Sequence, residues 1–477
     1  MPIIPCKIET SAMSLNTAAT DTALAAPARS LSSTANDLRV ASRGILRLII
    51  LVLIFNMLSA AIFMHRVNRP IYDDQYNIID VHMYATEGVS ANTIRANRTP
   101  PGPTSFVWMA GAVRLLGGEE LRDARIGAFV SWLLLATVIL VGARYSGFPN
   151  LWYGALLASL VFPHSVEAMA LVLTEGPALL LAVLGSLAWV EFVSRPRVTA
   201  GVLLLGIAGG LFIGLAVTAR QYFLALLPAA MILAVRQSRT RSLEDGRRWY
   251  SGVIFSLAVA VLPVLLLALI WRGFSSPGMA TGTSYPMWKA RIGLNFWRPI
   301  IAAFYAAFYL LPLTFPALLD VKRNHRWRAI TAALIGGATA GYFADSILQW
   351  GPLRTVVHFL GRGATGQSVI FGLIAVVTIY NAIAVVLVLW NKRSAIISCP
   401  PAVFALLTII FFVAEQFGVG GNIPLYDRYL LQMAPFLGLV AFSIFPRLTR
   451  GQVLTLIFLS LVSQIMLWRY ASAAYVS

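Results

Sequence analysis

Long apolar runs recur along this chain, and they constrain its fold more than any other feature. The runs are about 16 to 22 residues long, the length that a helix needs to cross roughly 30 Å of hydrocarbon. Short connections carrying Lys or Arg separate most of them. Charged residues make up 12% of the chain, against about a quarter in soluble proteins. The pattern predicts an all-α polytopic membrane protein.

The order of the runs also predicts a topology with about thirteen spans. With the N-terminus inside, every even-numbered connection falls inside and carries Lys or Arg, as the positive-inside bias requires. A merged or split pair of spans around 200–236 stays open. The predicted spans are 45–63, 125–144, 151–165, 176–193, 200–217, 221–236, 250–270, 299–319, 329–348, 369–390, 400–418, 429–446 and 452–470.

Three segments follow from this division of the chain. Residues 1–43 are rich in Ser, Thr and Ala and are predicted to form a disordered cytoplasmic tail before an uncleaved first span. Residues 44–240 form a first transmembrane module, which contains a long external loop at 64–124. Residues 241–477 form a more variable C-terminal transmembrane module.

Charge and cysteine content exclude several other classes of protein. The net charge of +18 does not indicate nucleic-acid binding, because no soluble domain is present to carry a basic face. The basic residues lie in membrane loops, where they set topology and attract anionic lipid. The two cysteines, Cys6 and Cys399, lie far apart and give neither zinc-ligand spacing nor a disulfide framework.

The first external loop, 64–124, is much longer than most connections between helices. Two stretches within it, "DDQYNIIDVHMYATEG" and "TSFVWMAGAVRLLGG", are apolar and interrupted by polar residues, which is typical of helices lying at a membrane surface. The segment "TPPGP" at 99–103 breaks the chain between them. We therefore expect two surface helices in this loop.

Acidic residues are scarce in this chain, and several gather at the outer ends of predicted spans. Asp73 and Asp74 stand side by side after the first span, where one carboxylate could cap a surface helix and another could act as a general base. Glu175 precedes an apolar helix, and Glu167 and His164 lie in the same external connection. An acid there suits a helix N-terminus, and it is equally a candidate for a functional site.

Basic residues on the outer side oppose the topology bias, so each calls for a reason. Snorkelling to lipid headgroups is the simpler explanation, and a phosphate-binding site is the alternative. The candidates are Arg220, Lys289, Arg291, Arg354, Arg362 and Arg428.

Histidines form the last group of candidates, and four of the five lie outside: His65, His82, His164 and His358. They lie near acids but lack HxxxH or HxE spacing, so a divalent metal stays open as a cofactor without a motif to support it. The chain also lacks a Walker motif and a nucleophile elbow.

Several short motifs, taken in their order along the chain, resemble the GT-C superfamily of membrane glycosyltransferases. The closest likeness is to the branch of protein O-mannosyltransferases and the lipid A aminoarabinose transferase. It covers most of residues 45–240 and the segment near 428. The motifs are "YDDQY", "TPPGPTSFVWMAGAVRLLGG", "RDARIGAF", "TEGP", "GLAVTARQYFLALLP" and "DRYLLQMAP".

The resemblance implies transfer of a sugar from a polyprenyl-phosphate donor to an acceptor on the outer face of a bacterial inner membrane. The acceptor would be a lipid, a lipopolysaccharide or other glycan, or a protein. The catalytic acids would be Asp73 or Asp74 as the base, with Glu175. The donor phosphate would be held by Arg220, Arg428, Arg291 and Lys289, and the acceptor or other substrate groups by Tyr76, His164, Glu167, Arg354 and His358.

Two departures from the family pattern bear on these roles. Tyr76 follows Asp73 by three positions instead of four, which leaves open whether Asp73 or Asp74 is the base. In addition, Glu175 stands where Asp is usual and Arg220 where Lys is commoner.

Two other classes compete with a transferase. A membrane glycan ligase or polymerase also has about a dozen spans, but its large external loop usually comes late in the chain, whereas here it is the first. A lipid-linked glycan transporter or flippase predicts charged residues in mid-span and two related halves. In this chain, the ionisable residues gather at span ends instead.

Overall fold

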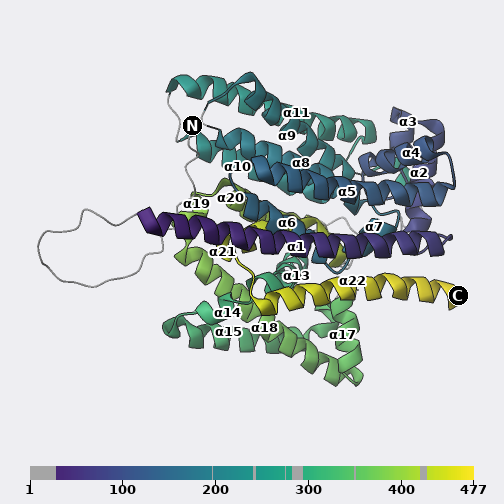
Figure 1. The fold of residues 1–477 in the computed structure, drawn as a ribbon. Helices are drawn as coiled ribbons and strands as arrows, with labels where there is room; N and C mark the ends of the chain where they lie inside the picture. The colour runs from purple at the N-terminus through teal and green to yellow at the C-terminus, as the bar shows by residue number, and fades with distance from the viewer. Residues whose placement is uncertain are drawn as a thin grey trace, which may run out of the picture.

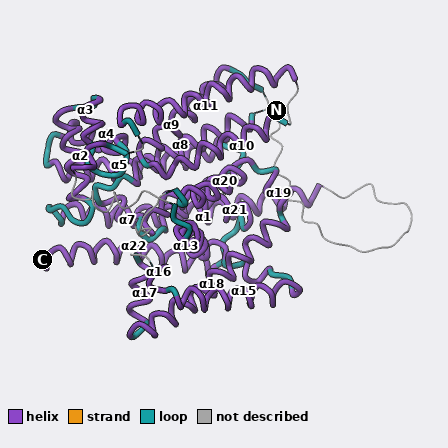
Figure 2. The backbone as a smooth tube through the Cα atoms, turned by 180° about the vertical axis from the view of Figure 1, so that it is seen from behind, coloured by secondary structure: helices purple, strands orange, loops and turns teal. Residues whose placement is uncertain are grey.

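Helices account for every regular element in the residues that the structure describes, and Figure 2 shows no strand among them. The structure is a computed structural model. It describes residues 28–195, 197–239, 243–273, 275–281, 294–348, 351–418 and 427–476. The chain is an all-α polytopic membrane protein, as its apolar runs predict.

Seven of the described helices are long and apolar enough to cross a membrane. They are α1 (Ala28–Arg66), α5 (Glu120–Tyr145), α8 (Glu175–Ser194), α9 (Ala200–Ala219), α11 (Leu243–Trp271), α18 (Gly363–Asn391) and α22 (Arg450–Val476).

The other predicted spans also coincide with helices. They are α6 (Pro149–Val161), α10 (Leu226–Ser238), α13 (Trp297–Thr314), α15 (Arg323–Tyr342), α20 (Pro400–Glu415) and α21 (Ala434–Ile444). The total of about thirteen crossings stays a prediction. The short elements in the inner and outer connections are α14 (Ala317–Asp320), α16 (Ala344–Ile347), α17 (Pro352–Leu360), α19 (Arg393–Ile397), η1 (Gln221–Ala225), η2 (Pro277–Thr281) and η3 (Asp427–Met433).

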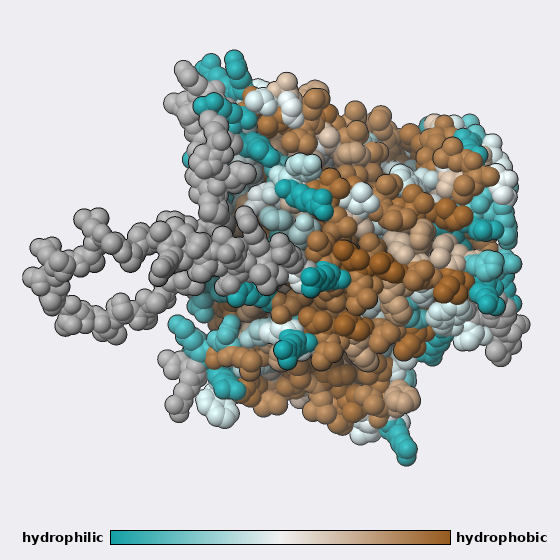
Figure 3. All heavy atoms as spheres, in the orientation of Figure 1, coloured by the Kyte–Doolittle hydropathy of each residue, from teal (hydrophilic) through white to brown (hydrophobic). Residues whose placement is uncertain are grey.

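The two ends of the helix bundle differ in what they carry. The first external loop folds into α2 (Asp74–Glu87), α3 (Ala91–Ala96) and α4 (Pro103–Leu116), which gather at one end with α7 (Ser165–Ala170). We call this the outer end and the opposite one the inner end. The described part of α1 starts at the inner end, and α22 finishes at the outer end (Figure 1), as an odd number of crossings requires. Apolar residues form a belt between two hydrophilic ends on the face shown in Figure 3.

Small residues and buried amides hold the helices close together. A side-chain carbon on Gly210 of α9 would lie 2.1 Å from the Ser256 carbonyl oxygen of α11, so glycine allows these two backbones to touch. Asn56 of α1 donates to the Leu160 carbonyl and accepts from Ser460 of α22. Such a polar contact between apolar helices fixes their register, because no water is present to replace a hydrogen-bond partner that moves away.

The predicted division of the chain at residues 43 and 240 stays a prediction. Helix α1 begins at Ala28, inside the segment that was predicted to be a disordered tail, and residues 1–27 lie outside the described part of the chain. The division at 240 separates two modules in sequence, but α21 from the second packs closely against α6 from the first. The outer site described below draws residues from both.

Candidate active site

Asp74 is completely buried at the start of α2, and both of its carboxylate oxygens are engaged. Oδ2 accepts from Arg125 of α5 at 2.5 Å, and Oδ1 accepts from the Val172 amide at 2.5 Å. Arg125 also donates to the Val67 and Arg69 carbonyls at the end of α1. Burial raises the pKa of the Asp74 carboxyl, and the Arg125 guanidinium opposes that shift. The pair joins α1, α2 and α5 at the outer end.

Asp73, its neighbour, lies in a different environment. Its side chain is about one-third exposed (34%), and Oδ2 accepts from the Arg428 guanidinium at 2.5 Å. Asp73 occupies the N-cap position of α2, yet its side chain makes no capping hydrogen bond, so capping does not explain this acid. The preceding residue, Tyr72, has a φ of 53°, and its ring lies under Arg428 at 5.0 Å. A non-glycine residue with positive φ persists only where surrounding contacts hold it.

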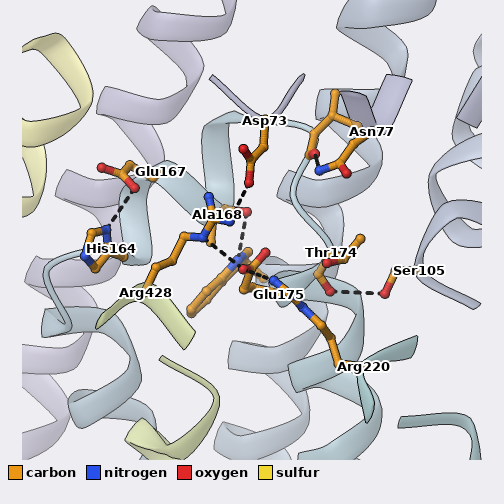
Figure 4. Close-up of polar contacts among 12 residues, drawn as sticks. Asp73, Asn77, Ser105, His164, Glu167, Ala168, Thr174, Glu175, Arg220 and Arg428 are labelled. Atoms are coloured by element: carbon orange, nitrogen blue, oxygen red, sulfur yellow. Dashed lines mark hydrogen bonds and ion pairs between the residues drawn. The ribbon is translucent and has the colours of Figure 1, made fainter. Parts of the chain in front are cut away.

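Glu175, the first residue of α8, brings two arginines together (Figure 4). Its Oε1 atom forms an ion pair with Arg220 and lies 3.1 Å from Nε of Arg428. Its Oε2 atom is buried and has no hydrogen-bond partner among the described residues, and the same is true of Nη1 of Arg428. Arg428 thus spans Asp73 and Glu175, and both the acid and the cation keep unused hydrogen-bonding capacity. We call Asp73, Glu175, Arg220 and Arg428 the outer cluster.

The TPPGP segment reaches the outer cluster through Gly102. Its amide donates to the Ala219 carbonyl at 3.2 Å, and a side-chain carbon at Gly102 would lie 1.8 Å from the Thr218 carbonyl oxygen. Thr104 and Thr218 also share a hydrogen bond of 2.7 Å. Only glycine permits so close an approach of two backbones. The segment is therefore packed on the residues directly before Arg220, and it holds the end of α9 in place.

Asp80 anchors the same segment from α2. Its carboxylate accepts from the Arg98 amide at 2.9 Å, the Thr99 amide at 3.0 Å and the Thr99 hydroxyl at 2.5 Å. Burial raises the pKa of Asp80, while these donors partly offset the shift. The third acid of the loop is thus a positioning residue, which the sequence did not distinguish from its neighbours.

His164 and Glu167 form a second buried pair at the outer end. His164 Nδ1 lies 2.9 Å from Oε2 of Glu167, and both side chains are almost fully buried. The other oxygen of Glu167 has no hydrogen-bond partner among the described residues. Figure 4 shows this pair on the far side of Arg428 from Arg220. Both predicted residues therefore flank the outer cluster.

A further buried cation, Arg298 of α13, was not among the residues nominated from the sequence. Its Nε donates to Gln416 at 3.0 Å, and Nη2 donates to the Tyr222 hydroxyl at 3.2 Å. Tyr222 in turn contacts the ring of Tyr429, over which Arg220 lies at 5.3 Å. The signal that singled out Arg220 and Arg428, an arginine at the outer end of an apolar helix, applies equally to Arg298.

The remaining nominated residues lie elsewhere. Tyr76 is exposed on α2. Arg354 donates to His358 at 3.3 Å on α17, which packs on α18 at the edge of the molecule remote from α3 and α4 (Figure 1). The structure thus does not gather Arg354 and His358 with the outer cluster, whereas the Tyr76 amide donates to the Asp73 carbonyl at 3.1 Å. Lys289 and Arg291 lie outside the described residues.

The outer cluster is built of carboxylates and guanidinium groups. Within the described ranges, no three His, Cys, Asp or Glu side chains lie close enough together to hold a metal ion. The cluster's arginines, by contrast, suit a phosphate group, which guanidinium binds through paired N–H donors.

Comparisons with known proteins give two similar structures. No protein-family model matches the sequence, and no curated protein matches it. Both solved structures are crystal structures of ArnT from Cupriavidus metallidurans, one in the apo state and one bound to undecaprenyl phosphate. They are 15% and 16% identical to this chain, with a TM-score of 0.38, and each match covers 89% of this chain and 78% of ArnT. A likeness of this degree does not establish a family or a function for this chain.

Proposed function

We propose that this protein is a membrane glycosyltransferase of the GT-C superfamily. It transfers a sugar from a polyprenyl-phosphate donor to an acceptor hydroxyl at the outer face of the membrane. The observation that carries the proposal is Arg428, which contacts both the partly exposed Asp73 and the buried Glu175 beside Arg220. A base and two phosphate-binding cations thereby meet at one point, next to the membrane in which the donor's lipid tail resides.

Asp73 is the general base in this proposal, and Asp74 positions it. Both oxygens of Asp74 already accept hydrogen bonds, from Arg125 and from backbone amides, and the residue is completely buried, so it is not open to a substrate. Asp73 is partly exposed and has one strong partner, Arg428. When a donor phosphate binds Arg428, it competes with Asp73 for the guanidinium, which frees the Asp73 carboxylate to contact the acceptor hydroxyl.

The reaction balances with these groups alone. The acceptor oxygen bonds to the anomeric carbon of the sugar, while the bond between that carbon and the phosphate oxygen breaks. Asp73 takes the acceptor's proton, and the electron pair leaves with the polyprenyl phosphate. Arg428 and Arg220 stabilise the negative charge that develops on the departing phosphate, which fixed donors in a water-poor site do strongly. Glu175 holds both arginines in place, and its second oxygen is available to a substrate hydroxyl.

The test uses the full-length protein in nanodiscs with short-chain polyprenyl-phosphate sugars as donors. The measurement is release of free polyprenyl phosphate by the wild type, Asp73→Asn, Asp74→Asn and the control Glu87→Gln, an exposed acid at the other end of α2. We expect Asp73→Asn to lower turnover by about 10²- to 10⁴-fold, the usual contribution of a general base. Glu87→Gln should match the wild type.

The result can go against the proposal in two ways. Wild-type turnover in folded Asp73→Asn protein would remove Asp73 as the base. No release from any donor by folded wild-type protein would shift the weight to a glycan ligase or a transporter.

A further inference from the structure

A groove at the inner end of the bundle has a basic rim and an apolar floor. It lies between the start of α9 and the start of α11 and encloses about 520 Å³. Arg247 and Arg248 form its basic part, and Leu203 and Phe255 contribute apolar surface. We call it the inner groove. It lies at the opposite end of α9 from the outer cluster, since α9 starts after Thr199 and ends before Arg220.

The groove opens toward lipid as well as toward the inner aqueous side. Helix α11 is among the least buried of the long helices, and Ile254 and Phe255 are exposed on it. Phe255 stands two helical turns from Arg247 and Arg248, so an apolar surface and two guanidinium groups lie about 11 Å apart along one helix. That distance joins the hydrocarbon region to the headgroup level. A molecule that satisfies both halves carries an anionic head on an apolar tail.

We propose that the inner groove binds an anionic phospholipid of the inner leaflet. Arg247 and Arg248 would contact the phosphodiester, and the acyl chains would lie along Leu203 and Phe255. Charge complementarity favours this occupant, because the described residues that line the groove include two arginines and no acid. A soluble phosphate would satisfy the arginines but would leave the apolar floor unused, which is why a lipid fits better.

The groove also connects to the outer cluster through α9. Gly210 and Gly214 bring the α9 backbone against α11, where a side-chain carbon would lie 2.1 Å and 2.3 Å from carbonyl oxygens of the partner helix. A lipid that bridges the starts of α9 and α11 therefore stabilises a helix pair whose far end carries Arg220. Binding at the inner leaflet should raise the thermal stability of the whole chain.

The test compares two variants of the full-length protein that lose equal charge at the inner end. Arg247→Gln with Arg248→Gln removes the basic rim, and Arg326→Gln with Arg328→Gln removes two exposed arginines of α15 outside the groove. Each protein is purified in a neutral detergent and titrated with phosphatidylglycerol or phosphatidylcholine. Native mass spectrometry counts retained lipid, and the melting temperature reports stabilisation.

We expect phosphatidylglycerol, but not phosphatidylcholine, to be retained by the wild type and to raise its melting temperature. The groove variant should bind about 30-fold more weakly, since each basic residue near an anionic lipid contributes roughly fivefold. The α15 variant should behave as the wild type. An equal loss in both variants, or equal binding of the two lipids, would overturn the proposal.

Inorganic phosphate is the remaining arm of the test. It should neither compete with phosphatidylglycerol nor raise the melting temperature. Competition by phosphate at millimolar concentration would assign the groove to a soluble anion and overturn the lipid assignment. These readouts do not involve sugar transfer, so they stand or fall separately from the transferase proposal.

Discussion

Four buried arginines at the outer end of the bundle contrast with four exposed arginines at its inner end. At the outer end, Arg125, Arg220, Arg298 and Arg428 are buried, with between 1% and 6% of each residue exposed. At the inner end, Arg144, Arg197, Arg326 and Arg328 are exposed. Three of the four outer arginines are paired with a carboxylate, and Arg298 contacts Gln416 and Tyr222.

The difference follows from the cost of removing a charge from water. A buried guanidinium is stable only when partners replace its hydration, so each of these four outer arginines requires a specific geometry. An exposed arginine at the inner end keeps its water or contacts lipid headgroups, and its position is correspondingly tolerant. A reaction site needs side chains held in fixed positions, whereas the orientation of the chain in the membrane needs only the charge of its arginines. The two ends should therefore respond very differently to the same substitution.

The largest effect is expected at the Asp74–Arg125 pair. Replacing Arg125 with Ala leaves a buried, unpaired carboxylate and should destabilise the protein by about 3–5 kcal/mol. The change is measured by unfolding the protein with heat or denaturant in a mild detergent. The double variant Asp74→Asn with Arg125→Gln removes both charges and should lose less. If the single and double variants lose the same amount, the ion pair is not what holds this loop.

The next largest effect is expected at Arg428, and it should be larger on turnover than on unfolding free energy. Arg428→Gln removes a donor to the departing phosphate, which typically costs about 10²- to 10³-fold in rate. Arg362→Gln, which changes an exposed outer arginine, serves as the matched control and should match the wild type. Similar losses in the two variants would mean that burial at the outer end does not mark function.

A smaller effect is expected where glycine allows the TPPGP segment to approach α9. Gly102→Ala forces the backbone away from Thr218 and should cost about 1–3 kcal/mol, as overpacking usually does. Turnover should fall with it, because Arg220 follows Thr218 by two residues at the end of α9. Gly111 of α4 has open space around it, so Gly111→Ala is the control and should be neutral or mildly stabilising. Unfolding free energy and turnover, measured together, separate the two variants.

The smallest effect is expected at the inner end. Arg326→Gln changes an exposed residue and should alter unfolding free energy by less than about 0.5 kcal/mol. Turnover should stay at the wild-type level. A large loss on either measure would contradict the contrast between the two ends, because it would reveal a specific partner for an arginine whose role is topological.

The sequence predicted the four residues of the outer cluster, but it missed one buried arginine and included one that lies elsewhere. Asp73, Glu175, Arg220 and Arg428 could be proposed because ionisable groups are rare at span ends in an apolar chain, and the structure brings these four together. Arg298 carries the same signal and was missed. Arg354 was nominated by that signal, yet it lies on α17, away from the outer cluster.

Local sequence also could not separate Asp73 from Asp74. The two residues are identical in type and adjacent, so composition and hydropathy do not distinguish them. Their difference comes from Arg125 on α5 and Val172 before α8, which reach Asp74 and not Asp73. Contacts between residues that are far apart along the chain follow from packing, which periodicity does not encode.

The sequence by itself determined the class of fold and the order of the apolar helices. It predicted two helices in the first external loop, where the structure has three, α2, α3 and α4. These predictions follow from hydropathy and helical period, which are local properties acting through the membrane as solvent. The tertiary structure alone decided which acid is locked by Arg125, which arginines share Glu175, and why Gly102 must be glycine. Those outcomes depend on which side chains replace water around each buried charge, and only the packed bundle specifies that.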